Sequence, residues 1–105
     1  MQAVDFSKEF KQFDGKVIPE SPENPKNFTL RTAAINALLA PPQQGEPPLI
    51  GTEQVKRYDL ASAIYAAKEP LDLEAEQVAL IKEQIAKTYG PLITGQAWKM
   101  IEGQL

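Results

Sequence analysis

Residues 73–103 read LEAEQVALIKEQIAKTYGPLITGQAWKMIEG, and this stretch predicts two helices joined at a corner. Val78, Ile81 and Ile85 recur at the spacing of one helical face, which predicts a helix over residues 74–88. Pro91 cannot continue that helix, and Gly90 before it suits the left-handed residue that commonly follows a helix end. A second helix is therefore expected over residues 91–102.

Gly95 and Trp98 are the two unusual residues of this last helix. An interior helical glycine costs roughly 1 kcal/mol against alanine, so Gly95 suggests the close approach of another backbone. Trp98 is the only tryptophan of the chain. It serves either as a core residue, which we favour, or as an anchor for a protein partner, because Trp and Tyr dominate binding interfaces. Tyr65 and Met100 are the other candidate partner-binding residues.

Two more helices are expected upstream. Thr29 is a suitable N-cap for a helix over residues 30–40, which the pair Pro41-Pro42 ends. Thr52 is expected to cap a helix over residues 53–67, which is apolar on several sides and therefore expected to be central. Loop 41–50 between them is rich in proline and reads as a stiff connector, with a PxxP-like ligand as the alternative.

The N-terminal residues 4–18 predict a β-hairpin. Val4, Phe6 and Phe10 alternate with polar residues, and Asp14-Gly15 is a strong signal for a two-residue turn. Such a turn would place Phe13 opposite Lys16 and Gln12 opposite Val17. Because an isolated hairpin is only marginally stable in water, its aromatic side chains are expected to pack on the helices.

Composition bounds both architecture and function. With 105 residues, the chain is expected to form a single domain, 1–105, of mainly helical α+β class, in which the hairpin packs on about four short helices. It holds no Cys and no His, which removes disulfides, thiol catalysis and the commonest general base. No nucleophile elbow, phosphate-binding loop or cofactor motif is present, so we expect no enzyme activity and no cofactor.

The charge pattern indicates the kind of partner. The net charge is -3 and no block of Lys or Arg occurs, so neither nucleic acid nor an anionic membrane is an expected partner. No apolar run approaches the ~20 residues that span a bilayer, and the N-terminus has no signal-peptide pattern. Asp72, Glu74 and Glu76 are the best acidic cluster for a metal, but acids at a helix start also complement the helix dipole, and this structural interpretation is favoured.

The chain resembles small uncharacterised proteins of tailed bacteriophages and prophages. The similar stretches are INALLAPP at 35–42, VKRYDLASAIYAA at 55–67, residues 71–98, and the hairpin with Asp14-Gly15-Lys16. The resemblance covers most of the chain and carries no catalytic motif. Relatives often have Thr where this chain has Glu74, which weakens the predicted helix cap at that position.

Three hypotheses about function follow, in order of preference. The first is a non-enzymatic protein that acts through protein–protein interaction in the cytoplasm of a bacterial host, in virion (tail) assembly. The second is a phage-encoded regulator that binds a host protein, with its acidic helix start mimicking nucleic acid. The third is a metal-dependent enzyme that uses Asp72, Glu74 and Glu76. A homodimer closed by the apolar stripes of the second and fourth helices remains an open alternative to a monomer.

Overall fold

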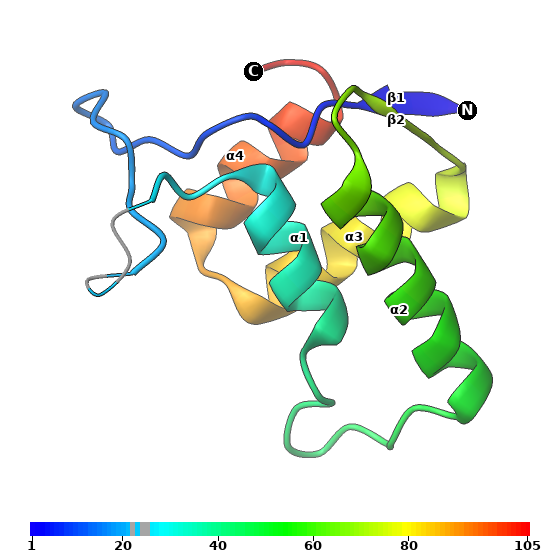
Figure 1. The fold of residues 1–105 in the computed structure, drawn as a ribbon. Helices are drawn as coiled ribbons and strands as arrows, with labels where there is room; N and C mark the ends of the chain where they lie inside the picture. The colour runs from blue at the N-terminus through cyan, green and yellow to red at the C-terminus, as the bar shows by residue number, and fades with distance from the viewer. Residues whose placement is uncertain (22, 24–25) are drawn as a thin grey trace.

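A computed structural model of the protein describes residues 1–21, 23 and 26–105. In these residues the chain forms β1 (Gln2–Val4), α1 (Leu30–Leu39), α2 (Gly51–Ala66), β2 (Leu71–Leu73), α3 (Ala75–Thr88) and α4 (Pro91–Ile101). The expected class, mainly helical α+β with an N-terminal strand segment on four helices, is confirmed (Figure 1). The four helices begin and end within two residues of the expected bounds.

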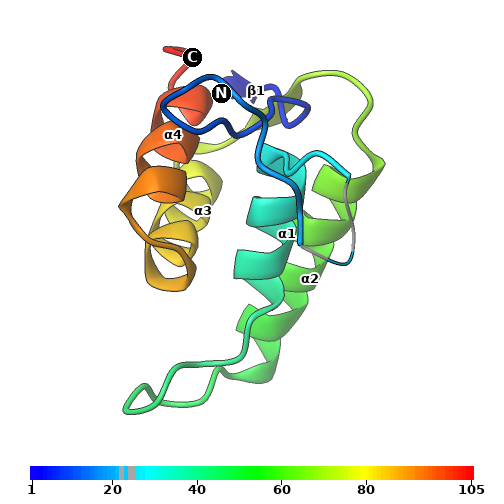
Figure 2. The ribbon, with the colours of Figure 1, turned by 90° about the vertical axis from the view of Figure 1, so that its left-hand side faces the viewer.

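Helix α1 lies at the centre of the helical layer, between α2 on one side and α3 on the other, while α4 packs on α3 (Figure 2). Its buried face includes Ala33, Ala34 and Ala37, and such small side chains allow neighbouring helices to approach closely. The expectation that the second helix is central is therefore wrong. Only Leu60, Ala61 and Ile64 of α2 are buried, because α2 packs mainly on α1 and leaves its outer side to solvent.

The N-terminal segment crosses the ends of the helices and caps α1. The carbonyl groups of Phe6 and Lys8 accept hydrogen bonds from the first-turn amides of Arg31 and Leu30. The Thr29 hydroxyl accepts a third, from the Thr32 amide, as the sequence predicts. The first amides of a helix have no partner inside it, so these contacts give the α1 N-terminus its missing acceptors.

Phe6 and Phe10 are fully buried, so the aromatic residues of the hairpin pack into the helical core as expected. They join one hydrophobic cluster with side chains from both strands and all four helices of the described chain. Phe10 and Phe28 pack with ring centroids 4.9 Å apart. This cluster joins the N-terminal segment firmly to the helices.

The turn at Asp14-Gly15 forms, but with a different register. Lys11 lies opposite Val17, and the Gln12 amide donates to the Lys16 carbonyl. The loop therefore has three residues, Phe13 to Gly15, with Gly15 in the left-handed region at φ 88°. A three-residue loop with glycine in that position is the next commonest hairpin turn after the two-residue form. The expected pairs Phe13–Lys16 and Gln12–Val17 are wrong by one residue.

The two-stranded sheet joins segments that are distant in the sequence. β1 pairs antiparallel with β2, with Ala3 opposite Asp72. The side-chain amide of Gln2 also donates to the Ile101 carbonyl at 2.5 Å, so the N-terminus is joined to the last turn of α4. These contacts attach the N-terminal segment to β2 and to the end of α4, which both belong to the second half of the chain.

Two predicted helix caps are wrong. Helix α2 begins at Gly51, two residues before the expected start, and Thr52 lies inside it rather than at the cap. Gly90 is extended (φ -85°, ψ -176°) and is the N-cap of α4, not a left-handed residue after α3. The residue before a proline is pushed towards extended backbone, so Pro91 explains this conformation. Glu74 caps α3, and its amide donates to the Gln77 side chain, which decides between Asp72 and Glu74.

Candidate functional site

The three candidate partner-binding residues do not form one surface. Tyr65 is 76% exposed on α2, Trp98 is 40% exposed on α4, and Met100 is only 6% exposed. Helices α2 and α4 lie on opposite sides of α1 (Figure 2). A single partner-binding site therefore has to be sought on one of these sides.

Trp98 is not the buried core residue that we favoured from the sequence. Its indole N–H donates to the Lys82 carbonyl of α3 at 3.2 Å, and the Lys82 ammonium lies 5.3 Å from the ring centroid. Lys82 in turn pairs with Glu102 at 2.7 Å. Trp98 therefore covers the seam between α3 and α4, with its polar atom already satisfied and Lys82 over its ring.

A groove opens on the other side of α4, between that helix and the N-terminal segment 7–13. Its volume is about 800 Å³. Its lining residues are Ser7, Lys8, Glu9, Lys11, Gln12, Phe13, Pro91, Leu92, Gly95, Gln96, Lys99, Met100 and Leu105. We call this the α4 groove. Of the candidate residues from the sequence, only Met100 lines it.

Large apolar side chains are exposed to solvent along the α4 groove. Phe13 at the hairpin tip is fully exposed, and Leu92 and Leu105 are also exposed. Leu92, Gly95 and Lys99 lie at the i, i+3, i+7 spacing of one helical face. One face of α4 is therefore open to solvent along the groove, and the tip of the hairpin lies beside it.

Gln96 fixes the width of the groove. The Lys11 amide donates to the Gln96 side-chain oxygen at 2.9 Å, and the Gln96 side-chain nitrogen donates to the Lys11 carbonyl at 2.8 Å. These two bonds hold the N-terminal segment against α4 across 85 residues of sequence. The groove is therefore a formed feature of the fold.

Gly95 lies in this groove with no neighbour that requires a glycine. A Cβ atom built on Gly95 meets no heavy atom within 4 Å. The expected close approach of another backbone of the chain is therefore wrong. Within the described residues, no contact compensates for the cost of a glycine inside the helix. The space next to Gly95 is open to solvent.

The α4 groove is positively charged although the chain is negative. Lys8, Lys11 and Lys99 line it, and none of them forms an ion pair within the described residues. Glu9 is the acidic side chain of the lining, and its carboxylate accepts a hydrogen bond from the Asn27 amide. Sequence reasoning missed this patch because its lysines come from two segments that are 80 or more residues apart.

A second groove is lined by acids and lies between α2 and the β2–α3 corner. Glu53 and Asp59 of α2 line it together with Asp72, Glu74 and Glu76. Within residues 1–21, 23 and 26–105, no three acidic side chains lie close enough to hold a metal ion. Glu74 instead caps α3, which agrees with the structural interpretation of these acids.

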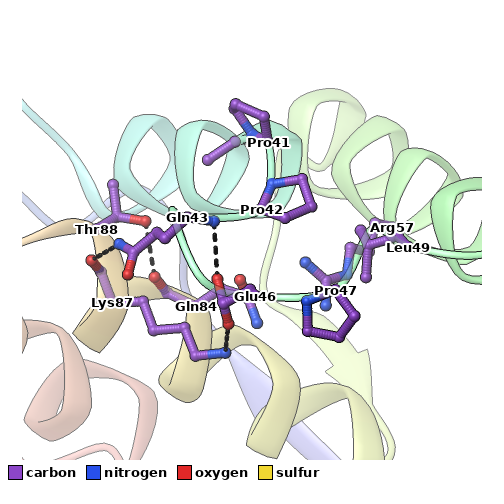
Figure 3. A pocket seen from close by; sticks show the side chains of 11 residues that line it. Pro41, Pro42, Gln43, Glu46, Pro47, Leu49, Arg57, Gln84, Lys87 and Thr88 are labelled. Atoms are coloured by element: carbon purple, nitrogen blue, oxygen red, sulfur yellow. Dashed lines mark hydrogen bonds and ion pairs between the residues drawn. The ribbon is translucent and has the colours of Figure 1, made fainter.

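A smaller cavity of about 150 Å³ lies under the loop that joins α1 to α2 (Figure 3). Gln43 donates to the Lys87 carbonyl at 2.5 Å, and Glu46 pairs with Lys87 at 2.7 Å. The bond from Lys87 holds the pKa of Glu46 below its usual range, and the same bond raises the pKa of Lys87. These contacts fasten the loop to α3.

Comparison of the chain with models of protein families, with curated proteins and with solved structures gives no match. In the part of the chain that the structure describes, no helix has the length and apolar character needed to cross a bilayer.

Proposed function

We propose that this chain is a non-enzymatic protein that binds another protein through the α4 groove. In keeping with its resemblance to small tailed-phage proteins, we assign the partner to virion (tail) assembly in the cytoplasm of a bacterial host. In this proposal the chain uses no cofactor and acts only by binding its protein partner.

The observation that carries the proposal is the group of exposed apolar side chains along the groove, Phe13, Leu92 and Leu105. Exposed apolar patches with a polar rim are typical of interaction sites, because monomeric soluble proteins rarely leave large apolar patches in contact with water. Leu92 and Phe13 are exposed beside the unfilled space at Gly95, and the two hydrogen bonds between Gln96 and Lys11 fix the position of the two groove walls. We expect a binding surface to be held in place by such hydrogen bonds between its supporting segments.

Site-specific photo-crosslinking tests the proposal. A photoreactive phenylalanine replaces Leu92 in the groove, and in a matched control it replaces Ser62, which is exposed on the far helix α2. Both variants are irradiated in cells in which a prophage carrying the gene is induced. Adducts that form from position 92 and not from position 62 support the proposed site.

The identity of the adduct separates the two leading functions. A virion structural or assembly protein supports the assembly role, whereas a host enzyme or regulator would replace it with the second hypothesis. Equal crosslinking from both positions, or none from either, would contradict a partner site in the groove.

A further inference from the structure

Building on the proposed function, we infer the chemistry of the partner segment: it is an amphipathic α-helix with an acidic flank. It lays its apolar face on Leu92 and Gly95 beside Phe13 and places its carboxylates against Lys8, Lys11 and Lys99. Three properties of the α4 groove lead to this inference.

The first property is that the backbone groups of residues 10–12, in the N-terminal wall of the groove, are already hydrogen-bonded within the chain. The amide and carbonyl of Phe10 are bonded to Phe28 and Ile18, and those of Gln12 to Lys16 and Gly15. Both groups of Lys11 are taken by Gln96. An extended segment that adds to a sheet edge needs such groups to satisfy its own backbone. A helix satisfies its backbone internally, so a helix suits this groove.

The second property is the missing side chain at Gly95. Helix α4 has 11 residues, which corresponds to a length of about 16 Å. Gly95 lies one turn after Leu92 along the exposed face, and nothing occupies the space where its Cβ would stand. Small residues at a helix crossing let two helix axes approach closely. A partner helix can therefore seat one large apolar side chain over Gly95.

The third property is the charge of the rim. Lys8, Lys11 and Lys99 have no ion-pair partner in the described residues, and they line the groove together with the exposed apolar side chains. Complementary charges at a rim mainly increase the rate and specificity of association. In a chain of net charge -3, this local positive patch selects for an acidic segment and against a basic one.

The rival occupant is a second copy of the chain. The surface of that second copy best suited to enter the groove would be α2, where Val55, Tyr58 and Tyr65 are exposed to solvent. Two copies each carry the same net negative charge, and this repulsion opposes their association. The inference therefore predicts a protein that stays monomeric when its partner is absent.

A peptide titration of the full chain tests the inference. The probe is a synthetic peptide of about 15 residues, long enough to form a helix when bound, with Leu at i, i+3, i+4 and i+7 and Glu at the flanking positions. One matched peptide carries Lys in place of Glu, and another has the composition of the probe in an order without a helical apolar face. Binding is followed by the NMR shifts of the chain's backbone amides.

We expect saturable shifts at Leu92, Gly95 and Gln96 with the acidic amphipathic peptide only, and weaker binding as NaCl is added. Lys8→Glu, Lys11→Glu and Lys99→Glu should each weaken binding by about twofold to fivefold, the range of exposed ion pairs. Gly95→Leu should remove the shifts. Its side chain enters open space, so the fold tolerates it, and its unfolding midpoint checks this directly.

Several results would overturn the inference. Equal binding of the Glu and Lys peptides would overturn it. The proposed function would still stand in that case if crosslinking from position 92 captures a partner. Binding of the peptide without a helical face would also overturn the inference. If crosslinking from position 92 fails as well, the proposed function falls with it. Concentration-dependent self-association that both Gly95→Leu and Tyr65→Ser abolish would identify a second copy as the occupant instead.

Discussion

The side-chain amide of Gln96 binds both backbone groups of Lys11, with bonds of 2.9 and 2.8 Å across 85 residues of sequence. The same side chain also donates to the Leu92 carbonyl within α4. One residue therefore ties the N-terminal segment to the last helix and sets the distance between the two walls of the groove.

Replacing Gln96 by alanine should destabilise the protein by about 1–3 kcal/mol, because each lost bond contributes about 0.5–1.5 kcal/mol net. Urea unfolding measures this as a lower midpoint with an unchanged slope. Amide exchange at Lys11 should also become faster. Ser62→Ala, on an exposed helical surface, is the matched control and should change stability by about 0.5 kcal/mol or less. An unaltered Lys11 exchange rate in Gln96→Ala would contradict the role given to this contact.

Gly95→Ala should stabilise the protein by about 1 kcal/mol. Alanine is the better helix former by that amount, and its Cβ meets no heavy atom within 4 Å. Gly15→Ala is the comparison, and it should destabilise the protein because Gly15 has a positive φ of 88°. Thermal unfolding of both variants checks the signs. A destabilised Gly95→Ala would mean that α4 is packed at this position after all.

Removal of the ring should reduce stability strongly at Phe10 and hardly at all at Phe13. Phe10 is fully buried against Phe28, so Phe10→Ala should cost about 3–5 kcal/mol. Phe13 is fully exposed at the hairpin tip, so Phe13→Ala should change the free energy of unfolding by about 0.5 kcal/mol or less. Crosslinking from position 92 should fall in Phe13→Ala if its ring contacts the partner. Similar losses of stability in the two variants would contradict the observed register of the turn.

The contact between Glu46 and Lys87 should make the attachment of loop 41–50 depend on pH. The Lys87 hydrogen bond lowers the pKa of Glu46 below its usual 4.5, so the stabilisation is present above that value and is lost as pH falls through the folded-state pKa. The pKa of Lys87 is raised above its usual 10.5, so the contribution persists below 10.5 and is lost as pH rises through the folded-state value. Because both groups are at the surface, the effect should be local and sensitive to salt.

NMR titration of the Gln43 amide, which donates to Glu46, follows this attachment directly. Its signal should move with an apparent pKa below 4.5, and the step should vanish in Glu46→Gln. Glu53→Gln, on an acid outside the loop, should leave the step in place. A Gln43 step that survives in Glu46→Gln would assign the titration to another group.

The sequence determined the features that arise from neighbouring residues. Apolar spacing in α3, the Thr29 cap of α1 and the break at Pro91 act within one or two turns of chain, so the four helices could be predicted within two residues. The turn at Asp14-Gly15 is equally local, and only its register differs. The resemblance to phage proteins and the function drawn from it stay predictions.

Only the tertiary structure decided which apolar faces are covered. The sequence places Val55, Tyr58 and Tyr65 on an apolar stripe of α2, yet they are exposed, because α2 packs mainly on α1 and leaves its outer side to solvent. The pairing of Ala3 with Asp72 and the Gln96 contact with Lys11 also join segments far apart in sequence. The groove in front of Gly95 is made by this long-range packing, and a helix's own periodicity holds no information about what lies opposite its glycine.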